Sequence, residues 1–454
     1  MGKHVAFWFR RDLRLNDNAG LYHALRAGQP VVPVFIFDRH ILDNLSAKVD
    51  ARVHFIRDVI GELSQELKEF GSSIVVRYGF PEEIWPELAK EFDLSAVYTN
   101  RDYEPYANQR DEQVRQLLGQ HNCAFHTFKD HVIFEQLEVE KNDGGPYTVF
   151  TPYSRKWKEK LASRMAAATI DGERQQLSFY LKPYPTESYF DQLASLPQQP
   201  IPDLEDMGFA TSSIEIPPRS VQRKLIKNYD QTRNFPAQEG TSRLGIHFRF
   251  GTISIREKAW RAQQLNDTFL NELIWRDFYA QILANFPYVA ERSFRPEYDY
   301  IDWRNDETEF KAWCEGRTGY PIVDAGMRQL NQSGYMHNRV RMITASFLTK
   351  HLLIDWRWGE AYFAEKLLDY DLASNNGGWQ WAAGCGTDAA PYFRIFNPAS
   401  QQAKFDKDYR YVREWVPEYG TDDYPDPIVD HKMARERCLD VYKSGLDRGK
   451  AQHG

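Results

Sequence analysis

The sequence has little cysteine: four residues, Cys123, Cys314, Cys385 and Cys438, in a chain of 454. They lie far apart and form no CxxC pair, which excludes the usual spacing of a zinc site or an iron–sulfur cluster, so we predict no metal site. A disulfide framework is typical of short secreted chains and does not fit a chain of this length. We therefore expect reduced and mostly buried thiols.

Long hydrophobic runs are also missing. No stretch reaches the roughly 18 apolar residues that span a bilayer. The first apolar run, Val5–Phe9, is followed at once by Arg10 and Arg11, which is not the order of a signal peptide. We expect a cytoplasmic protein that does not bind a membrane, with Val5–Phe9 as its first strand.

An excess of basic residues is absent as well, because 57 Lys+Arg stand against 64 Asp+Glu and give a net charge of −7. Neither the first 200 residues nor the remainder is basic, so nucleic-acid binding would need a local patch. Aromatic residues are abundant, with 12 Trp, 25 Tyr and 28 Phe. They indicate either large cores or a site that uses rings for stacking or for carrying electrons.

The first 130 residues alternate between short apolar runs and helical patterns. Continuous apolar strands are typical of a parallel sheet buried on both faces. The alternation predicts a doubly wound, Rossmann-like α/β domain over 1–130, and the lack of GxGxxG after the first run argues against a dinucleotide held there. The expected strands are 5–9, 31–37, 73–78, 96–99 and 124–127, and the expected helices lie near 19–27, 50–70, 82–92 and 108–120.

Residues 131–204 differ in character and indicate a long interdomain linker. Turn-rich stretches lie at 143–146, 182–185 and 197–202. From 205 to 454 long helical patterns dominate. The sequence therefore predicts an α/β domain, a linker and an all-α domain, in that order.

The densest polar signal lies at 369–381, which combines acidic residues, amides, a Gly-Gly pair and two tryptophans. Glycines allow a ligand to approach the backbone, and amides and carboxylates can hydrogen-bond a polar heterocycle. Trp379 and Trp381 are two positions apart, so on a helix they face different surroundings. A polar loop before two core tryptophans is the alternative interpretation.

A second segment places Asn338, Arg341 and Met342 on one helix face, at i, i+3 and i+4. Arg339 and Arg341 enter a helix with an apolar end, and such arginines need anionic partners. The partners are phosphates or carboxylates, and the sequence leaves both open.

Two weaker patterns accompany it. Glu272, Trp275 and Arg276 share a helix face that suits a planar, polar ligand; the alternative is a packed helix with an exposed ion pair. Thr241 and Ser242 follow a glycine in a pattern typical of a helix N-cap, and a helix N-terminus with hydroxyls is a natural phosphate site.

Together these segments resemble the photolyase/cryptochrome family over nearly the whole chain. The resemblance rests on Trp-Phe-Arg-Arg-Asp-Leu-Arg-Leu at 8–15, Thr-Gly-Tyr-Pro-Ile-Val-Asp at 318–324, Asn-Asn-Gly-Gly-Trp-Gln-Trp at 375–381 and Tyr-Phe-Arg-Ile-Phe-Asn-Pro at 392–398. It implies an N-terminal antenna-binding α/β domain, a long linker and a C-terminal helical domain that binds FAD.

The resemblance also implies a cofactor site, in which Asn375 faces flavin N5 and two acids lie near the flavin ring and ribitol. Trp379, Trp356 and Trp303 match the family's chain of electron-transfer tryptophans between flavin and surface. The residues expected to hold FAD are Tyr229, Thr241, Ser242, Arg243, Leu244, Asp369, Asp371 and Asn375.

Within the family, Met342 and Trp275 follow the class I cyclobutane pyrimidine dimer pattern. The (6-4) branch has histidines where this chain has Asn338 and Met342, so the acid–base step of that repair is missing here. Plant cryptochromes usually place aspartate at Asn375, and a neutral amide leaves the reduced flavin available as an electron donor. A cryptochrome-type blue-light sensor is the first alternative, and (6-4) repair is the second.

The expected activity is light-dependent repair of cyclobutane pyrimidine dimers in double- or single-stranded DNA by a monomeric lyase. The dimer flips out of the helix into a pocket, and photoexcited reduced FAD donates one electron to it. Glu272, Asn338, Met342 and Asn375 form the expected catalytic set. The expected contacts to lesion or phosphates are Arg233, Glu272, Trp275, Arg276, Asn338, Arg339, Met342, Trp381 and Arg394.

A second, antenna chromophore is expected in the α/β domain. Folate-binding relatives place an Asn-Glu pair after a Tyr-Glu pair, whereas Tyr103-Glu104 is followed here by Pro105-Tyr106. Asp102 and the Glu-Pro-Tyr string are more similar to deazaflavin-binding members. We expect 8-hydroxy-deazaflavin ahead of FMN or methenyltetrahydrofolate.

Overall fold

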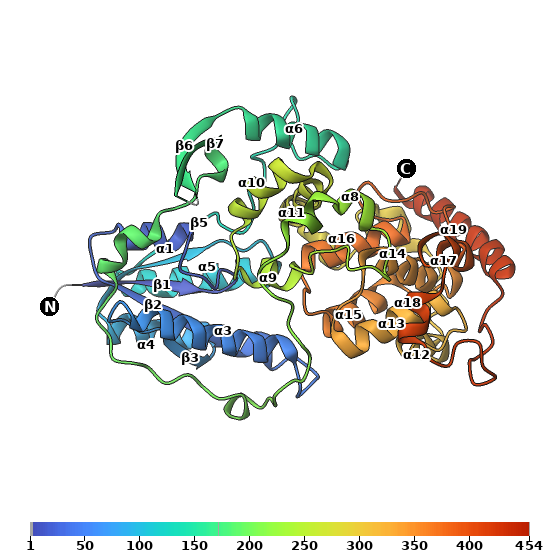
Figure 1. Cartoon of the computed structure of the whole chain (residues 1–454), viewed down its shortest axis with the longest axis horizontal. Helices are drawn as coiled ribbons and strands as arrows, with labels where there is room; N and C mark the ends of the chain where they lie inside the picture. The colour runs from blue at the N-terminus through green and yellow to red at the C-terminus, as the bar shows by residue number, and fades with distance from the viewer. Residues whose placement is uncertain (1–2, 171, 454) are drawn as a thin grey trace. The chain divides into compact units, whose positions relative to one another are not determined.

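The chain forms two compact units, each assembled from separate segments of the sequence (Figure 1). The structure is a computed structural model that describes residues 3–170 and 172–453. Unit 1 comprises Met1–Val139, Arg155–Ser220 and Leu244–Gln264, and unit 2 comprises Glu140–Ser154, Val221–Arg243 and Leu265–Gly454.

Unit 1 contains a five-stranded parallel sheet in the order β3-β2-β1-β4-β5. The central strands are buried along almost their whole length because both faces are covered, as their continuous apolar sequence predicted. All five predicted strands are present. They are β1 (His4–Phe9), β2 (Val31–Asp38), β3 (Val75–Gly79), β4 (Leu94–Asn100) and β5 (Ala124–Phe128).

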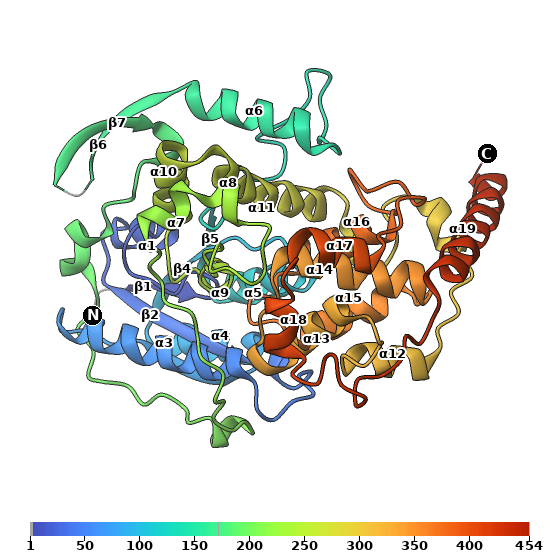
Figure 2. The ribbon, with the colours of Figure 1, turned by 45° about the vertical axis from the view of Figure 1, so that its right-hand side comes forward.

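The predicted helices of this unit are also present and flank the sheet (Figure 2). They are α1 (Ala19–Leu25), α3 (Ala51–Lys68), α4 (Pro81–Glu91) and α5 (Pro105–Gln120), with a short α2 (Arg39–Leu42). Helices α4 and α5 cover one face, where Trp85 packs on Trp8. Helix α1 covers the other face, where Gly20 lies against Phe7. The doubly wound α/β prediction is therefore confirmed.

A buried ion-pair network ties a later segment of the chain into unit 1. That segment contains α9 (Gly245–Phe250) and α10 (Ile255–Leu265). Arg256 bonds both Asp17 and Asp130 at 2.8 Å, and Arg14 bonds Asp130 at 2.7 Å. Burial raises the pKa of Asp130, but the two arginines outweigh it and hold the pKa below its ordinary value. Each buried charge thus has an opposite partner.

The predicted linker contains regular elements that the sequence analysis missed. Residues 143–146, 182–185 and 197–202 are largely irregular, as the turn signals indicated. Among them lie α6 (Phe150–Ala162), a hairpin of β6 (Met165–Ile170) and β7 (Glu173–Ser178), and the 3-10 turns η1 (Phe179–Leu181) and η2 (Thr186–Gln192). Strand β6 is rich in alanine, so it lacks the β-branched alternation that marks a strand.

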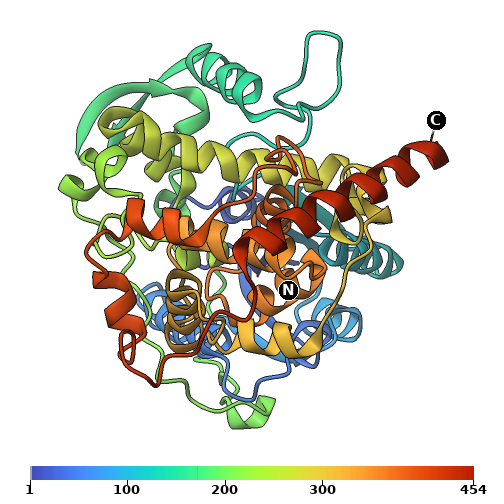
Figure 3. The same cartoon turned by 90° about the vertical axis from the view of Figure 1, so that its right-hand side faces the viewer.

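Unit 2 is helical apart from its loops. Its core holds the fully buried rings of Trp313, Trp356 and Trp379. Unit 2 also contains the 3-10 helices η4 (Pro287–Ala290) and η5 (Pro296–Tyr300) and the π-helix η6 (Phe347–His351). The remaining 3-10 helix, η3 (Glu205–Met207), belongs to unit 1. The α-helices of unit 2 are α7 (Arg223–Lys227), α8 (Tyr229–Thr232), α11 (Asp267–Asn285), α12 (Glu307–Cys314), α13 (Pro321–Ser333), α14 (Asn338–Ser346), α15 (Trp356–Lys366), α16 (Leu372–Ala383), α17 (Pro398–Phe405), α18 (Arg410–Trp415) and α19 (His431–His453). Figure 3 shows α19 as the last, long helix of this unit.

Three properties concern the described residues as a whole. Within residues 3–170 and 172–453, no helix combines the length and apolar character needed to cross a membrane. The same residues contain no group of three or more His, Cys, Asp or Glu side chains arranged to hold a metal ion. The four cysteines are free thiols; three are buried and Cys314 is partly buried.

Candidate functional site

Residues predicted for the lesion and for the cofactor meet at one cavity in unit 2. The cavity has a volume of about 420 Å³ and is formed by α11, α14, the end of α15 and α16. Figures 1 and 2 show α11, α14 and α16 side by side. Small-molecule sites typically enclose about 300–1,000 Å³. The predicted residues in the wall are Arg233, Glu272, Trp275, Arg276, Asn338, Met342, Asp369, Asp371, Asn375, Trp379 and Trp381.

Helix α11 presents Glu272, Trp275 and Arg276 to the cavity, as their spacing predicted. The helix begins at the cap Asn266, whose side chain accepts a hydrogen bond from a first-turn N–H at 3.1 Å. The Glu272 carboxylate forms an ion pair with Arg233. Burial raises the pKa of Glu272, and Arg233 offsets part of that rise. A paired carboxylate at the wall can accept N–H bonds from a nucleobase.

Helix α14 presents Asn338 and Met342 to the same cavity. It begins at the cap His337, whose Nδ1 accepts the backbone N–H of Arg339 at 3.1 Å. Burial, together with neighbouring arginines, lowers the pKa of His337 to about 4. The imidazole is therefore neutral at pH 7 and serves as a helix cap, which leaves Asn338 and Met342 as the groups that face a ligand.

A polar cluster connects the cavity wall to the loop at 241–243. Arg341 Nη2 lies 3.0 and 3.1 Å from the two carboxylate oxygens of Asp369, so this arginine has a carboxylate partner. Thr241 Oγ1 is hydrogen-bonded to the Tyr335 hydroxyl at 2.9 Å. The Arg243 guanidinium lies 5.1 Å from the Tyr335 ring. The sequence analysis missed Tyr335 because its partners come from distant parts of the chain.

The N-cap interpretation of Thr241 and Ser242 is wrong. Helix α9 begins after them, and its cap residue Leu244 makes no side-chain cap bond. Residues 241–244 form a loop in which Arg243 takes a left-handed φ of 50°. Leu244 is buried in unit 1, and Tyr229 is buried in unit 2. None of these five residues lines the cavity, and their contact with FAD stays a prediction.

Helix α16 carries the amide expected at the flavin. The helix begins at Asp371, whose side chain accepts a first-turn N–H at 3.0 Å. The Asn375 amide nitrogen donates to the Glu360 backbone oxygen at 3.1 Å and to the Glu360 carboxylate at 2.8 Å. Burial raises the pKa of Glu360, and the bond from Asn375 lowers it in part. Glu360 was not predicted, since fifteen positions of sequence separate it from Asn375.

The two glycines of α16 have different roles. A Cβ added at Gly377 would lie 2.2 Å from the Tyr279 ring, so this glycine permits close packing of α16 on α11. A Cβ added at Gly378 would meet nothing within 4 Å, and Gly378 lines the cavity. Only Gly378 thus agrees with the interpretation that the pair faces a ligand.

The three tryptophans of the predicted chain share one buried cluster. Trp379 lines the cavity and is 2% exposed, and Trp356 is equally buried at the start of the neighbouring α15. Trp303 is partly exposed and packs against the same cluster. Trp303 is thus the most exposed of the three, and their role as an electron path stays a prediction.

The four predicted phosphate contacts lie in different surroundings. Arg233 and Arg276 line the cavity, and Arg394 is exposed. Arg339 is half-buried: it donates to the Asn234 side chain at 2.7 Å and lies 4.5 Å from the ring of Phe405. Its contacts indicate that Arg339 serves packing as well as charge.

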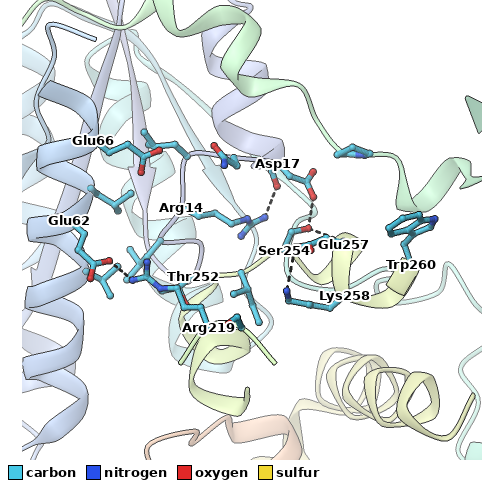
Figure 4. A pocket seen from close by; sticks show the side chains of 18 of the residues that line it. Arg14, Asp17, Glu62, Glu66, Arg219, Thr252, Ser254, Glu257, Lys258 and Trp260 are labelled. Atoms are coloured by element: carbon cyan, nitrogen blue, oxygen red, sulfur yellow. Dashed lines mark hydrogen bonds and ion pairs between the residues drawn. The ribbon is translucent and has the colours of Figure 1, made fainter. Parts of the chain in front are cut away.

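A second cavity, of about 500 Å³, lies inside unit 1 and contains none of the predicted site residues (Figure 4). Arg219 pairs with Glu62 across it, and the buried Arg14 and Asp17 belong to the ion-pair network described above. These pairs satisfy much of the charge in the wall, although the buried Nε of Arg14 has no hydrogen-bond partner among the described residues.

Comparison with known proteins adds to this geometry. A family model described as the FAD binding domain of DNA photolyase matches residues 269–421, and one described as DNA photolyase matches residues 5–171. The deoxyribodipyrimidine photo-lyase of Halobacterium salinarum is 38% identical in an alignment that covers 96% of this chain and 98% of the relative. The chain belongs to the DNA photolyase family.

Solved photolyase structures share the fold. A class III photolyase from Agrobacterium tumefaciens matches with a TM-score of 0.82 and 33% identity, covering 98% of each chain. An archaeal photolyase from Sulfolobus tokodaii, described with two FAD molecules, matches with a TM-score of 0.78 and 35% identity over 97% of this chain and all of that one. The predicted family and the α/β plus helical fold are confirmed.

The cavity fits the flavin group that this photolyase domain binds. Its wall combines the apolar side chains of Phe363, Leu367 and Trp379 with polar groups at Asn375 and Asp371. Such a wall suits a flat ring with polar edges. The matched FAD-binding region also includes nearly all of α11 and the whole of α14 and α16, which contribute to the cavity wall.

Proposed function

We propose that this photolyase is a deoxyribodipyrimidine photo-lyase, a lyase that splits the carbon–carbon bonds of cyclobutane pyrimidine dimers in DNA under blue light. Curated relatives with this activity align over nearly the whole chain. The observation that carries the proposal is the meeting of Glu272, Trp275, Asn338, Met342 and Trp381 with the flavin-side residues at one cavity.

The residues proposed to hold FAD are Asp369, Asp371 and Asn375 at the cavity and Tyr229, Thr241, Ser242, Arg243 and Leu244 beyond it. Bound and reduced, FAD would supply under light the electron that opens the dimer ring, and because that electron would return after the ring has split, the reaction would have no net redox change. Asn375 contributes an amide that cannot act as an acid. It therefore leaves the reduced group without a proton donor at that position.

The chain's own side chains bind and orient the lesion. Trp275 and Trp381 form flat apolar walls that suit a dinucleotide taken out of the base stack. The Glu272 carboxylate and the Asn338 amide offer hydrogen bonds to the base edges, and Met342 provides a soft apolar contact. No nucleophile or general base is required, because light and electron transfer open the ring.

The residues proposed to contact DNA phosphates around the pocket are Arg233, Arg276, Arg339 and Arg394. They supply the local positive patch that a net charge of −7 does not provide. Double- and single-stranded damaged DNA are the proposed substrates, and a monomer in the cytoplasm is the proposed active form.

Trp379, Trp356 and Trp303 are proposed to pass electrons from the surface to oxidised FAD under light. Trp379 lies at the cavity and Trp303 reaches the surface. This path restores the reduced cofactor and is separate from the path between cofactor and lesion.

The antenna chromophore is proposed to be 8-hydroxy-deazaflavin, ahead of FMN or methenyltetrahydrofolate, bound in the domain at 1–130. Asp102 and Tyr106 lie near the carboxyl end of the sheet, where ligands of doubly wound folds bind. Asp102 accepts from Arg11 at 2.9 Å, and the Tyr106 hydroxyl donates to Asp38 at 2.5 Å. Residues 131–204 are the proposed linker, and 205–454 the proposed catalytic domain.

A blue-light sensor is the alternative function, and (6-4) repair is a second. The sensor would use the same cofactor and tryptophans without a lesion pocket, whereas (6-4) repair would need histidines at Asn338 and Met342. The complete set of lesion-facing residue types at one cavity favours dimer repair.

The decisive experiment measures turnover of an oligonucleotide with one thymine dimer by reduced, FAD-loaded protein under blue light. We expect repeated turnover in light and none in the dark. An oligonucleotide with a (6-4) photoproduct serves as the matched substrate and should stay unrepaired. A protein that binds FAD yet repairs neither lesion would favour the sensor.

A further inference from the structure

The ring of Phe150 lies flat on the indole of Trp275. Their centroids are 3.7 Å apart and their planes differ by 4°. Trp275 belongs to α11, whereas Phe150 is the first residue of α6 and comes from the turn-rich stretch between the α/β and helical parts of the sequence. Both residues belong to unit 2.

Contacts on both sides of Phe150 hold its segment against α11. The Phe150 backbone N–H donates to the Asp388 carboxylate at 3.3 Å. Before it, the Tyr147 carbonyl accepts from the Gln281 amide at 2.8 Å. After it, the Tyr153 ring packs on Phe278 at 5.3 Å. The position of the Phe150 ring is thus fixed by its neighbours and not by Trp275 alone.

The stacked ring covers one face of the Trp275 indole. Trp275 lines the cavity wall, and Phe150 does not. The Trp275 indole also meets Phe278 edge-on at 5.5 Å and Tyr279 at 5.4 Å. Beside these contacts, part of the indole still lines the cavity.

We propose that Phe150 is a positioning residue for lesion recognition, which holds the Trp275 indole ready to stack on the flipped dimer. The proposal rests on the proposed function, in which Trp275 contacts the lesion. A ring that is already fixed loses less side-chain freedom when the dimer binds, so a larger share of the stacking energy appears as affinity. Phe150 would act only through Trp275 and would not touch DNA.

The test compares dissociation constants for one duplex with and without a thymine dimer. Phe150→Leu keeps an apolar side chain but removes the flat ring, so it is the main variant, and Phe150→Ala is the second. We expect both to weaken binding to the dimer duplex by about two- to tenfold, the range of an aromatic pair, with unchanged binding to the undamaged duplex. Phe150→Tyr keeps the ring and should bind as the wild type does.

Two further variants test whether the loss of affinity comes from Trp275 or from a general change in the structure. Val149→Ala changes the exposed neighbour of Phe150 and should leave both affinities unchanged. In a Trp275→Ala background, Phe150→Leu should cause no additional loss, because coupled residues are non-additive. Bound FAD per protein, measured by absorbance, should be the same in all variants.

The outcomes separate the two claims. If the wild type does not prefer the dimer duplex, the proposed function fails and this inference fails with it. If the wild type prefers it and Phe150→Leu keeps the full preference, only the inference is overturned. An equal loss on both duplexes, or the same loss in the Trp275→Ala background, would also overturn it, since either result means a general effect on the fold.

Discussion

The Asn375 side chain donates both of its N–H bonds to Glu360, one to the backbone oxygen at 3.1 Å and one to the carboxylate at 2.8 Å. The amide oxygen is therefore the atom that remains for the cavity, where it can only accept a hydrogen bond. The neutral amide is thus oriented by a carboxylate on the neighbouring helix. The orientation of the Asn375 amide therefore depends on Glu360 as well as on the residue type at position 375.

Glu360→Gln is expected to make stability less dependent on pH. Burial raises the pKa of Glu360 above its ordinary 4.5, so the folded protein binds this proton more tightly than the unfolded chain. Stability from this group is present below the ordinary value and is lost as pH rises through the raised pKa. The midpoint of thermal unfolding, measured from pH 4 to 8, should therefore fall less with rising pH in Glu360→Gln than in the wild type.

Glu104→Gln in unit 1 serves as the control, because that carboxyl pairs with Arg11 and Arg249 outside the cavity. In Glu104→Gln the midpoint of thermal unfolding should still fall with rising pH, because Glu360 is unchanged. A wild type and Glu360→Gln with parallel pH curves would contradict the assignment of a buried, protonatable Glu360.

Trp379→Phe is expected to slow photoreduction of oxidised FAD severely. Trp379 is a buried ring at the cavity, where the proposed path to Trp303 starts, and phenylalanine is much harder to oxidise than indole. Repair by chemically reduced protein should remain largely intact, since the tryptophan does not lie between cofactor and lesion in the proposed arrangement. Flavin absorbance under blue light measures the first rate, and dimer turnover measures the second. A pre-reduced variant with normal FAD content but little repair would show that the role is misassigned.

Gly359→Ala is expected to destabilise the protein, although alanine favours a helix. An added Cβ would lie 2.1 Å from the Trp379 ring and 2.6 Å from Leu348, so α15 or the indole must shift. Overpacking of this kind costs about 1–3 kcal/mol. Thermal unfolding of the FAD-loaded protein measures the change, and photoreduction should slow as well because Trp379 is displaced.

Gly61→Ala provides the matched control for that substitution. Gly61 also lies inside a helix, α3, but an added Cβ there meets nothing within 4 Å. It should stabilise by about 0.5–1 kcal/mol through the loss of glycine's backbone freedom. If Gly359→Ala were equally stabilising, the close contact with Trp379 would be refuted.

The sequence predicted what depends on local pattern. Strands β1 and β2 were found because a strand buried on both faces is a continuous apolar run, and Glu272, Trp275 and Arg276 were found because helical spacing puts them on one face. The N-cap at Thr241 failed because a Gly-Thr-Ser string also suits a loop, and here its hydroxyl bonds Tyr335 instead of a first-turn N–H. Glu360 and Phe150 were missed since each is defined by a tertiary contact, which leaves no trace in local spacing.

Arg394→Gln and Arg339→Gln are expected to differ in their effects. Arg394 is exposed, so its loss should weaken binding to damaged and undamaged DNA alike and reduce the salt dependence by about 0.9 per phosphate contact. Arg339 contacts Asn234 and Phe405, so its loss should also lower the unfolding temperature. Affinities over a salt series and thermal unfolding together test this. Unchanged salt dependence in Arg394→Gln would remove that residue from the proposed DNA contacts.

Asn338→His together with Met342→His is expected to lower dimer repair without producing efficient (6-4) repair. Both side chains line the cavity, and Met342 Sδ receives a contact from Arg339 Nη1 at 3.6 Å that an imidazole would not reproduce. Met342 is partly buried, so an imidazole there that finds no hydrogen-bond partner costs about 1–3 kcal/mol, whereas position 338 is exposed.

The charge around α14 also works against the new histidines as acids. Burial and the arginines at 341, 339, 243 and 233 lower the pKa of the adjacent His337 to about 4. A histidine at 338 or 342 would lie beside the same arginines, which should lower its pKa and disfavour the protonated form that can give a proton. Repair of both lesions by reduced protein of known FAD content, measured between pH 5 and 8, tests this. Unchanged dimer repair in the double variant would show that neither side chain touches the lesion, and efficient (6-4) repair at pH 7 would show that the arginines do not suppress protonation.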